Sequence, residues 1–85
     1  MSTPESKVKA KVKRILDDLK VYHFSPVMTG FGRSGIPDII CCVNGHFVGI
    51  ECKAGANRPT ALQARELRAI HDAGGSAFVV NEKNI

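Results

Sequence analysis

The sequence predicts a small α/β domain, at the border with the α+β class, in which two helices flank a mixed β-sheet in the order αβββαβ. Two segments, one at the N-terminus and one after residue 60, carry apolar residues at helical spacing. Between them, two apolar runs flank Asn44-Gly45, and this dipeptide is the strongest short-range signal of a β-hairpin. A further apolar run follows Gly74-Gly75, so a last strand is expected after the second helix.

The length of 85 residues allows one domain spanning residues 1–85. A chain of this size buries only about 60% of its unfolded surface, so association with a second copy would help it. The net charge of +4, from twelve Lys and Arg against eight acids, favours a polyanionic partner such as DNA. Three cysteines without CxxC spacing are expected to be buried thiols rather than a disulfide framework or a zinc site.

The sequence has no phosphate-cradling glycine fingerprint and no apolar run of the roughly 20 residues that span a membrane. We therefore expect an intracellular, soluble protein, cytoplasmic or nucleoid-associated, with no organic cofactor and no membrane partner.

The first helix is predicted to begin with Thr3 as its cap and Pro4 at its first position, and to end near Lys20. Glu5 lies in its first turn, where an acid favours the positive end of the helix. Its basic residues lie mostly off the apolar stripe, and they form either a solvated face or a track for DNA phosphates. The stripe consists of Val8, Val12, Ile15, Leu16 and Leu19.

The segment 22–27 predicts a short strand, broken near Pro26 and therefore at the edge of the sheet. Three glycines mark the segment 28–35 as a flexible loop that leads to Asp38. Arg33 and Ser34 in this loop either bind a DNA backbone phosphate or are simply solvated.

The predicted hairpin brings two acids together. With Asn44 and Gly45 as the turn, Val43 pairs with His46, and the same register places Asp38 opposite Glu51. Directly opposed residues have Cβ atoms about 5 Å apart. Two carboxylates at this distance repel one another unless a cation lies between them.

Alternation along the strand assigns the remaining side chains to two faces. Lys53 shares the face of Glu51, and Gly49 on that face is expected to leave room for a substrate. The other face is predicted to be core, with Ile39, Cys41, Val43, Val48, Ile50 and Cys52.

The second helix is predicted to begin at a capping box formed by Thr60 and Gln63 and to end at Gly74-Gly75. Arg58 precedes it, as either a phosphate ligand or a solvated loop residue. The last strand is expected to comprise residues 77–80.

A carboxylate pair with a neighbouring amine suits metal-assisted phosphodiester hydrolysis. Hard oxygen ligands favour Mg²⁺ or Mn²⁺, which polarises a phosphoryl oxygen and acidifies water. Lys53 would orient that water or neutralise developing charge.

Pro37-Asp38 followed by Glu51-Cys52-Lys53 resembles the active-site signature of the PD-(D/E)XK nuclease superfamily. The chain is most similar to the VRR-NUC family, over nearly its whole length, from Arg33 to Asp38 and on through the last strand. The resemblance implies a restriction-endonuclease-like core and a homodimeric, structure-specific DNA endonuclease, such as a Holliday-junction resolvase. Small stand-alone domains of this type resemble phage-encoded ones. The Val-Arg-Arg element that gives the family its name is not evident, which puts the subfamily and the substrate preference in doubt.

The resemblance implies a role for each matching residue. Asp38, Glu51 and the backbone carbonyl of Cys52 would be ligands of the metal, and Lys53 would be the catalytic amine. Gln63 would support the site, and Glu5 would complete the metal sphere.

Plainer interpretations remain for these residues. Asp38, Glu51 and Lys53 could be solvent-facing strand residues, Gln63 a capping residue only and Glu5 a helix-dipole acid. The whole chain could then be a non-catalytic DNA-binding module or a subunit of a replication or repair complex.

Overall fold

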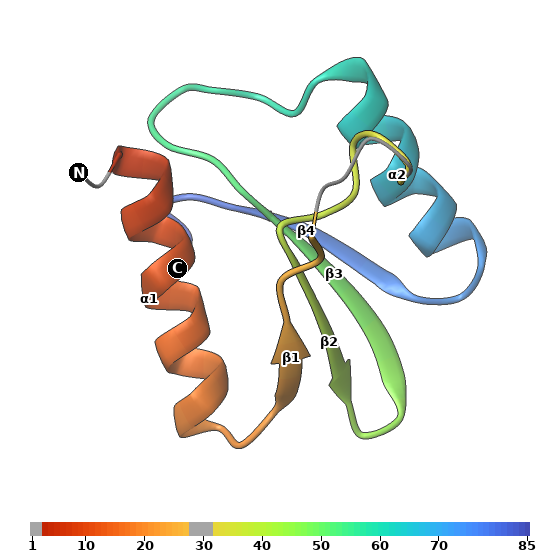
Figure 1. Cartoon of the computed structure of the whole chain (residues 1–85), viewed down its shortest axis with the longest axis horizontal. Helices are drawn as coiled ribbons and strands as arrows, with labels where there is room; N and C mark the ends of the chain where they lie inside the picture. Colours follow the sequence, from red (N-terminus) through yellow and green to blue (C-terminus); the bar gives the residue numbers. More distant parts are fainter. Residues whose placement is uncertain (1–2, 28–31) are drawn as a thin grey trace.

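The computed structural model describes residues 3–27 and 32–85, which form one four-stranded sheet with a helix on each face (Figure 1). In chain order the elements are α1 (Pro4–Asp18), β1 (Tyr22–Phe24), β2 (Ile39–Val43), β3 (His46–Cys52), α2 (Ala61–Asp72) and β4 (Ser76–Val80). The spatial order is β1-β2-β3-β4, with antiparallel pairs among the first three strands and β4 parallel to β3. This mixed sheet confirms the predicted order and is consistent with a restriction-endonuclease-like core.

Helix α1 begins where its sequence predicts. The Thr3 side chain accepts a hydrogen bond from the Ser6 amide, and Pro4 occupies the first turn. The helix ends at Asp18, two residues before the predicted end, because Lys20 adopts a left-handed conformation with φ of 59°. Strand β1 follows at the edge of the sheet, as predicted, and it ends at Phe24, before Pro26. The first part of the predicted glycine loop, residues 28–31, lies outside the described residues.

The hairpin has the predicted turn and register. Asn44 and Gly45 have φ of 52° and 82°, and Val43 pairs with His46. The ladder ends at Ile39 and Ile50, so the expected strand pairing of Asp38 with Glu51 is wrong. Pro37 precedes Asp38 and has no N–H to continue the ladder.

The core lies between α1 and one face of the sheet. Val8, Val12 and Leu16 of α1 pack against five of the six predicted core residues, namely Ile39, Cys41, Val48, Ile50 and Cys52. The sixth, Val43, is 37% exposed, because it lies next to the turn at the end of the hairpin.

Helix α2 covers the opposite face through Ile70. A Cβ added to Gly49 would lie 2.7 Å from Ile70 Cδ1 and 3.1 Å from Pro37 Cγ. The prediction that Gly49 leaves space for a substrate is therefore wrong, since helix packing fills that space. Thr60 and Gln63 form the predicted capping box, and the last strand starts at Ser76, one residue earlier than expected. Among the described residues, no helix has the length and apolarity to cross a membrane.

Candidate metal centre

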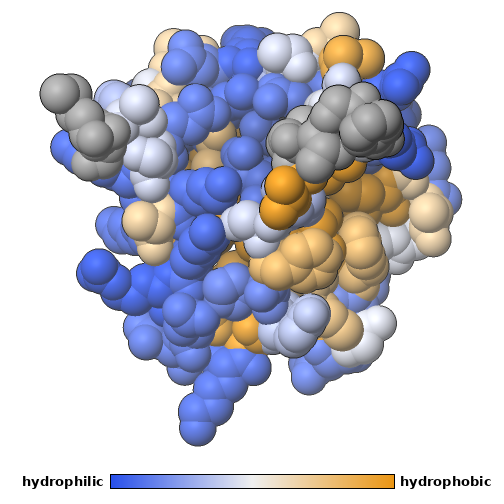
Figure 2. Space-filling model, viewed as in Figure 1, coloured by the Kyte–Doolittle hydropathy of each residue, from blue (hydrophilic) through white to orange (hydrophobic). Residues whose placement is uncertain are grey.

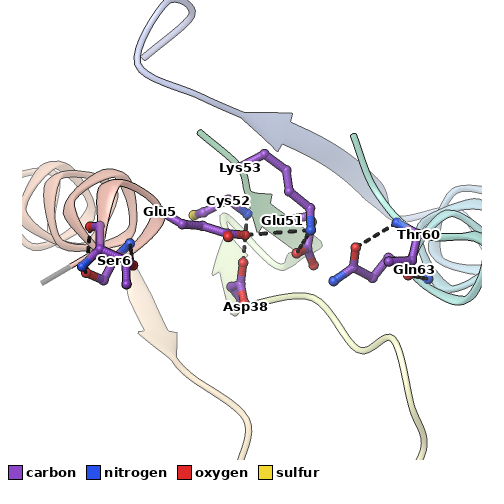
Figure 3. Close-up of polar contacts among 9 residues, drawn as sticks. Glu5, Ser6, Asp38, Glu51, Cys52, Lys53, Thr60 and Gln63 are labelled. Atoms are coloured by element: carbon purple, nitrogen blue, oxygen red, sulfur yellow. Dashed lines mark hydrogen bonds and ion pairs between the residues drawn. The ribbon is translucent and has the colours of Figure 1, made fainter. Parts of the chain in front are cut away.

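Three carboxylates from separate elements meet at one end of the sheet. Glu5 comes from the first turn of α1, Asp38 from the residue before β2, and Glu51 from β3. One oxygen of each lies within 4.8 Å of the others. Figure 3 shows the three side chains converging, with Lys53 beside them. This grouping was expected from the sequence, and the fold brings it about although Asp38 is not paired within the ladder.

Asp38 is fixed by backbone contacts on both sides. Its Oδ2 accepts a hydrogen bond of 2.8 Å from the Cys52 N–H, and the adjacent Ile39 side chain is fully buried. Further back, Gly35 has φ of +82° and packs so closely against α2 that an added Cβ would lie 2.6 Å from the Leu62 carbonyl. The approach to Asp38 is thus held between the end of β3 and the first turn of α2.

Glu51 has the least favourable environment for a negative charge among the three carboxylates. Only 1% of the residue is exposed, and its buried Oε1 has no hydrogen-bond partner among the described residues. Burial raises the pKa of Glu51 to about 7, and repulsion by Asp38 acts in the same direction. A smaller rise in this pKa comes from Glu5, whereas Lys53 lowers it.

Lys53 compensates only part of this negative charge. Its Nζ lies 3.7 Å from Glu51 Oε2 and 3.6 Å from Glu5 Oε1, and its side chain is largely buried. Its ammonium therefore contacts two of the three carboxylates.

The donor set fits a hard divalent cation. Mg²⁺ and Mn²⁺ prefer carboxylate and carbonyl oxygens, and a buried carboxylate oxygen without a hydrogen-bond donor is suited to such an ion. The Cys52 thiol is a poor ligand, because burial and the neighbouring carboxylates raise its pKa to about 12. Its side chain also lies in the core, so only its backbone carbonyl is a candidate ligand.

Gln63 lies on the other side of Glu51. Its Oε1 accepts a hydrogen bond of 2.8 Å from the Thr60 N–H, which confirms the capping interpretation. Figure 3 shows the same side chain extending from α2 toward Glu51, so capping and support of the centre are compatible.

The three basic and polar residues predicted to bind DNA lie on exposed loops. Ser34 and Arg58 make no hydrogen bond or ion pair with the carboxylates in the part of the chain that the structure describes. Arg33 instead pairs with Glu66 of α2 at 2.8 Å. Glu66 was not among the residues predicted from the sequence, although its position four residues before Ile70 places it on the sheet-facing side of the helix.

Comparison with known proteins finds a distant relative. No family model matches the chain, so membership of the VRR-NUC family stays a prediction. Over 55 residues the chain is 33% identical to a protein of Acyrthosiphon pisum secondary endosymbiont phage 1 that is named Putative nuclease p44. The alignment covers 64% of this chain and 59% of that protein.

Proposed function

We propose that the chain is a Mg²⁺- or Mn²⁺-dependent endodeoxyribonuclease that hydrolyses phosphodiester bonds. The observation that carries this proposal is the buried Glu51 oxygen, which has no hydrogen-bond partner in the described part of the chain and lies within a group of three carboxylates beside the Lys53 ammonium. The name of the phage relative supports the same class of activity.

Each residue of the centre has a separate proposed role in the reaction. Asp38, Glu51, the Cys52 carbonyl and Glu5 would hold the cation, which when bound polarises a phosphoryl oxygen and makes water more acidic. Lys53 contacts both Glu51 and Glu5, so its ammonium is placed to orient the attacking water or to neutralise charge that develops on the phosphate. Gln63 supports Glu51 from α2.

Branched DNA, such as a Holliday junction, is the proposed substrate, and a homodimer the proposed form. The resemblance to stand-alone VRR-NUC proteins, the net charge of +4 and the position of the short strand β1 at the edge of the sheet support this proposal. Arg33, Ser34 and Arg58 are the proposed phosphate contacts, and the reaction would take place on DNA inside a cell.

Cleavage of synthetic DNA tests this proposal. A four-way junction, a flapped duplex and a linear duplex are incubated with the wild type and with Asp38→Asn, Glu51→Gln and Lys53→Met. Asp72→Asn is the matched control, because this acid is exposed at the far end of α2. Cleavage should require Mg²⁺ or Mn²⁺, stop in the first three variants and persist in the control.

Other outcomes would contradict the proposal in different ways. DNA binding without cleavage in any divalent ion would indicate a binding module. Equal cleavage by all variants would reject the assigned centre.

A further inference from the structure

A hollow of about 360 Å³ lies between β3 and α2, outside the carboxylate cluster. This volume is within the range of about 300–1,000 Å³ that small-molecule sites occupy. Its lining combines one aromatic ring, several aliphatic side chains and one ion pair. The main lining residues are Phe47, Ile70, Ala69, Ala73, Arg33 and Glu66.

Phe47 supplies the aromatic ring of the lining, and this ring is exposed to solvent in the folded chain. Phe47 is 50% exposed, and the strand register places it on the sheet face that also carries Gly49 and Glu51. Phe24 of β1 is similarly exposed on this face, opposite Ile40. Figure 2 shows hydrophobic residues gathered over β2 and β3 beside α2.

The ion pair in the lining of the hollow fixes a guanidinium in place. The Glu66 carboxylate is buried, and it accepts a hydrogen bond of 2.8 Å from Arg33. The Arg33 side chain is nevertheless 71% exposed. A guanidinium has five N–H donors, so those not bonded to Glu66 are presented to a ligand at a defined orientation.

We propose that this hollow binds one unpaired nucleotide of a DNA substrate, with the base stacked on Phe47 and a phosphate at Arg33. The inference rests on the proposed nuclease function and specifies its substrate class. Phe47 lies four residues from Glu51 along β3, or roughly 13 Å, so one DNA strand can reach both places. A fully paired duplex offers no free base. Among branched substrates, the hollow therefore favours flaps and other branches with unpaired nucleotides over a fully paired four-way junction.

Fluorescence binding in EDTA tests the inference without cleavage. A single-stranded oligonucleotide that contains 2-aminopurine is titrated with the wild type, Phe47→Leu and Glu66→Gln. Phe78→Leu is the matched control, because Phe78 is 53% exposed but lies on the opposite sheet face, beside Ile50.

Stacking on an aromatic ring contributes enough affinity that we expect at least about fivefold weaker binding and loss of quenching in Phe47→Leu. Glu66→Gln should weaken binding less, through a misplaced Arg33, and the control should match the wild type. Far-UV circular dichroism establishes that each variant is folded.

The result that would overturn the inference is equal affinity and quenching in the wild type and Phe47→Leu. Sedimentation velocity gives a second criterion, because a change of oligomeric state in Phe47→Leu alone would identify a second copy of the chain as the occupant. The nuclease proposal is tested separately, by measuring whether the protein cleaves DNA in Mg²⁺. An active enzyme that binds paired and unpaired DNA equally would reject only the nucleotide site.

Discussion

Replacing Glu51 with Gln is expected to stabilise the metal-free protein at pH 8 while it abolishes cleavage. Glutamine has the shape of the protonated acid and carries no charge, so it removes the repulsion from Asp38 and the cost of burying an anion. A residue needed only for folding would show the opposite effect on stability.

The magnitude follows from the pKa of Glu51, which burial raises from an ordinary value of 4.5 to about 7. Between these values the folded protein binds more protons than the unfolded chain, so the free energy of unfolding falls as the pH rises through this window. Each pKa unit corresponds to about 1.4 kcal/mol, and the total loss in the wild type is therefore about 3 kcal/mol. Above pH 7 the loss is complete, and below pH 4.5 it is absent.

Urea unfolding in EDTA, followed by circular dichroism from pH 4 to pH 8, measures this effect. The variant and the wild type should agree at pH 4, and the variant should be more stable by about 3 kcal/mol at pH 8. Mg²⁺ at pH 8 should stabilise only the wild type. A difference that is constant with pH, or a variant that is less stable at pH 8, would refute the reasoning.

Three further substitutions test the packing and the chemistry. Gly49→Ala should destabilise the fold by about 1 kcal/mol in urea unfolding, because its Cβ would lie 3.1 Å from the rigid Pro37 ring, whereas Ile70 Cδ1 at 2.7 Å ends a flexible side chain and can move; an unchanged midpoint would contradict these contacts. Gly35→Ala should cost at least about 2 kcal/mol and also weaken Mg²⁺ binding in calorimetry, since φ of +82° and the Leu62 carbonyl at 2.6 Å leave no place for a methyl group. Lys53→Met should reduce the cleavage rate at least about 100-fold in single-turnover assays with little change in DNA affinity, and a parallel loss of affinity would assign Lys53 to binding.

The parts of the fold that the sequence predicts are those that local chemistry determines. The turn at Asn44-Gly45 sets the register of the hairpin, and side-chain alternation then assigns Ile39 and Ile50 to the core. The caps of both helices follow in the same way from Thr3 and Thr60.

The features that the sequence did not predict depend on contacts between distant segments. The ladder ends at Ile39 because the Asp38 side chain accepts the hydrogen bond of the Cys52 N–H. The space beside Gly49 is filled by Ile70, which depends on where α2 packs on the sheet. The pairing of Arg33 with Glu66 likewise joins two elements whose relative position no local pattern determines. The acidic cluster was predictable because two of its members lie on one hairpin.

The position of Glu5 links the proposed metal centre to the start of the chain. A cation shared by Glu5 and the interior strand β3 would cross-link the first turn of α1 to the sheet. Amide hydrogen exchange just after Pro4 would then slow when the ion binds, which gives a reporter of occupancy that needs no DNA. An affinity tag placed before α1 would lie only a few residues from Glu5 along the chain, so the position of the tag matters for any assay of the proposed centre.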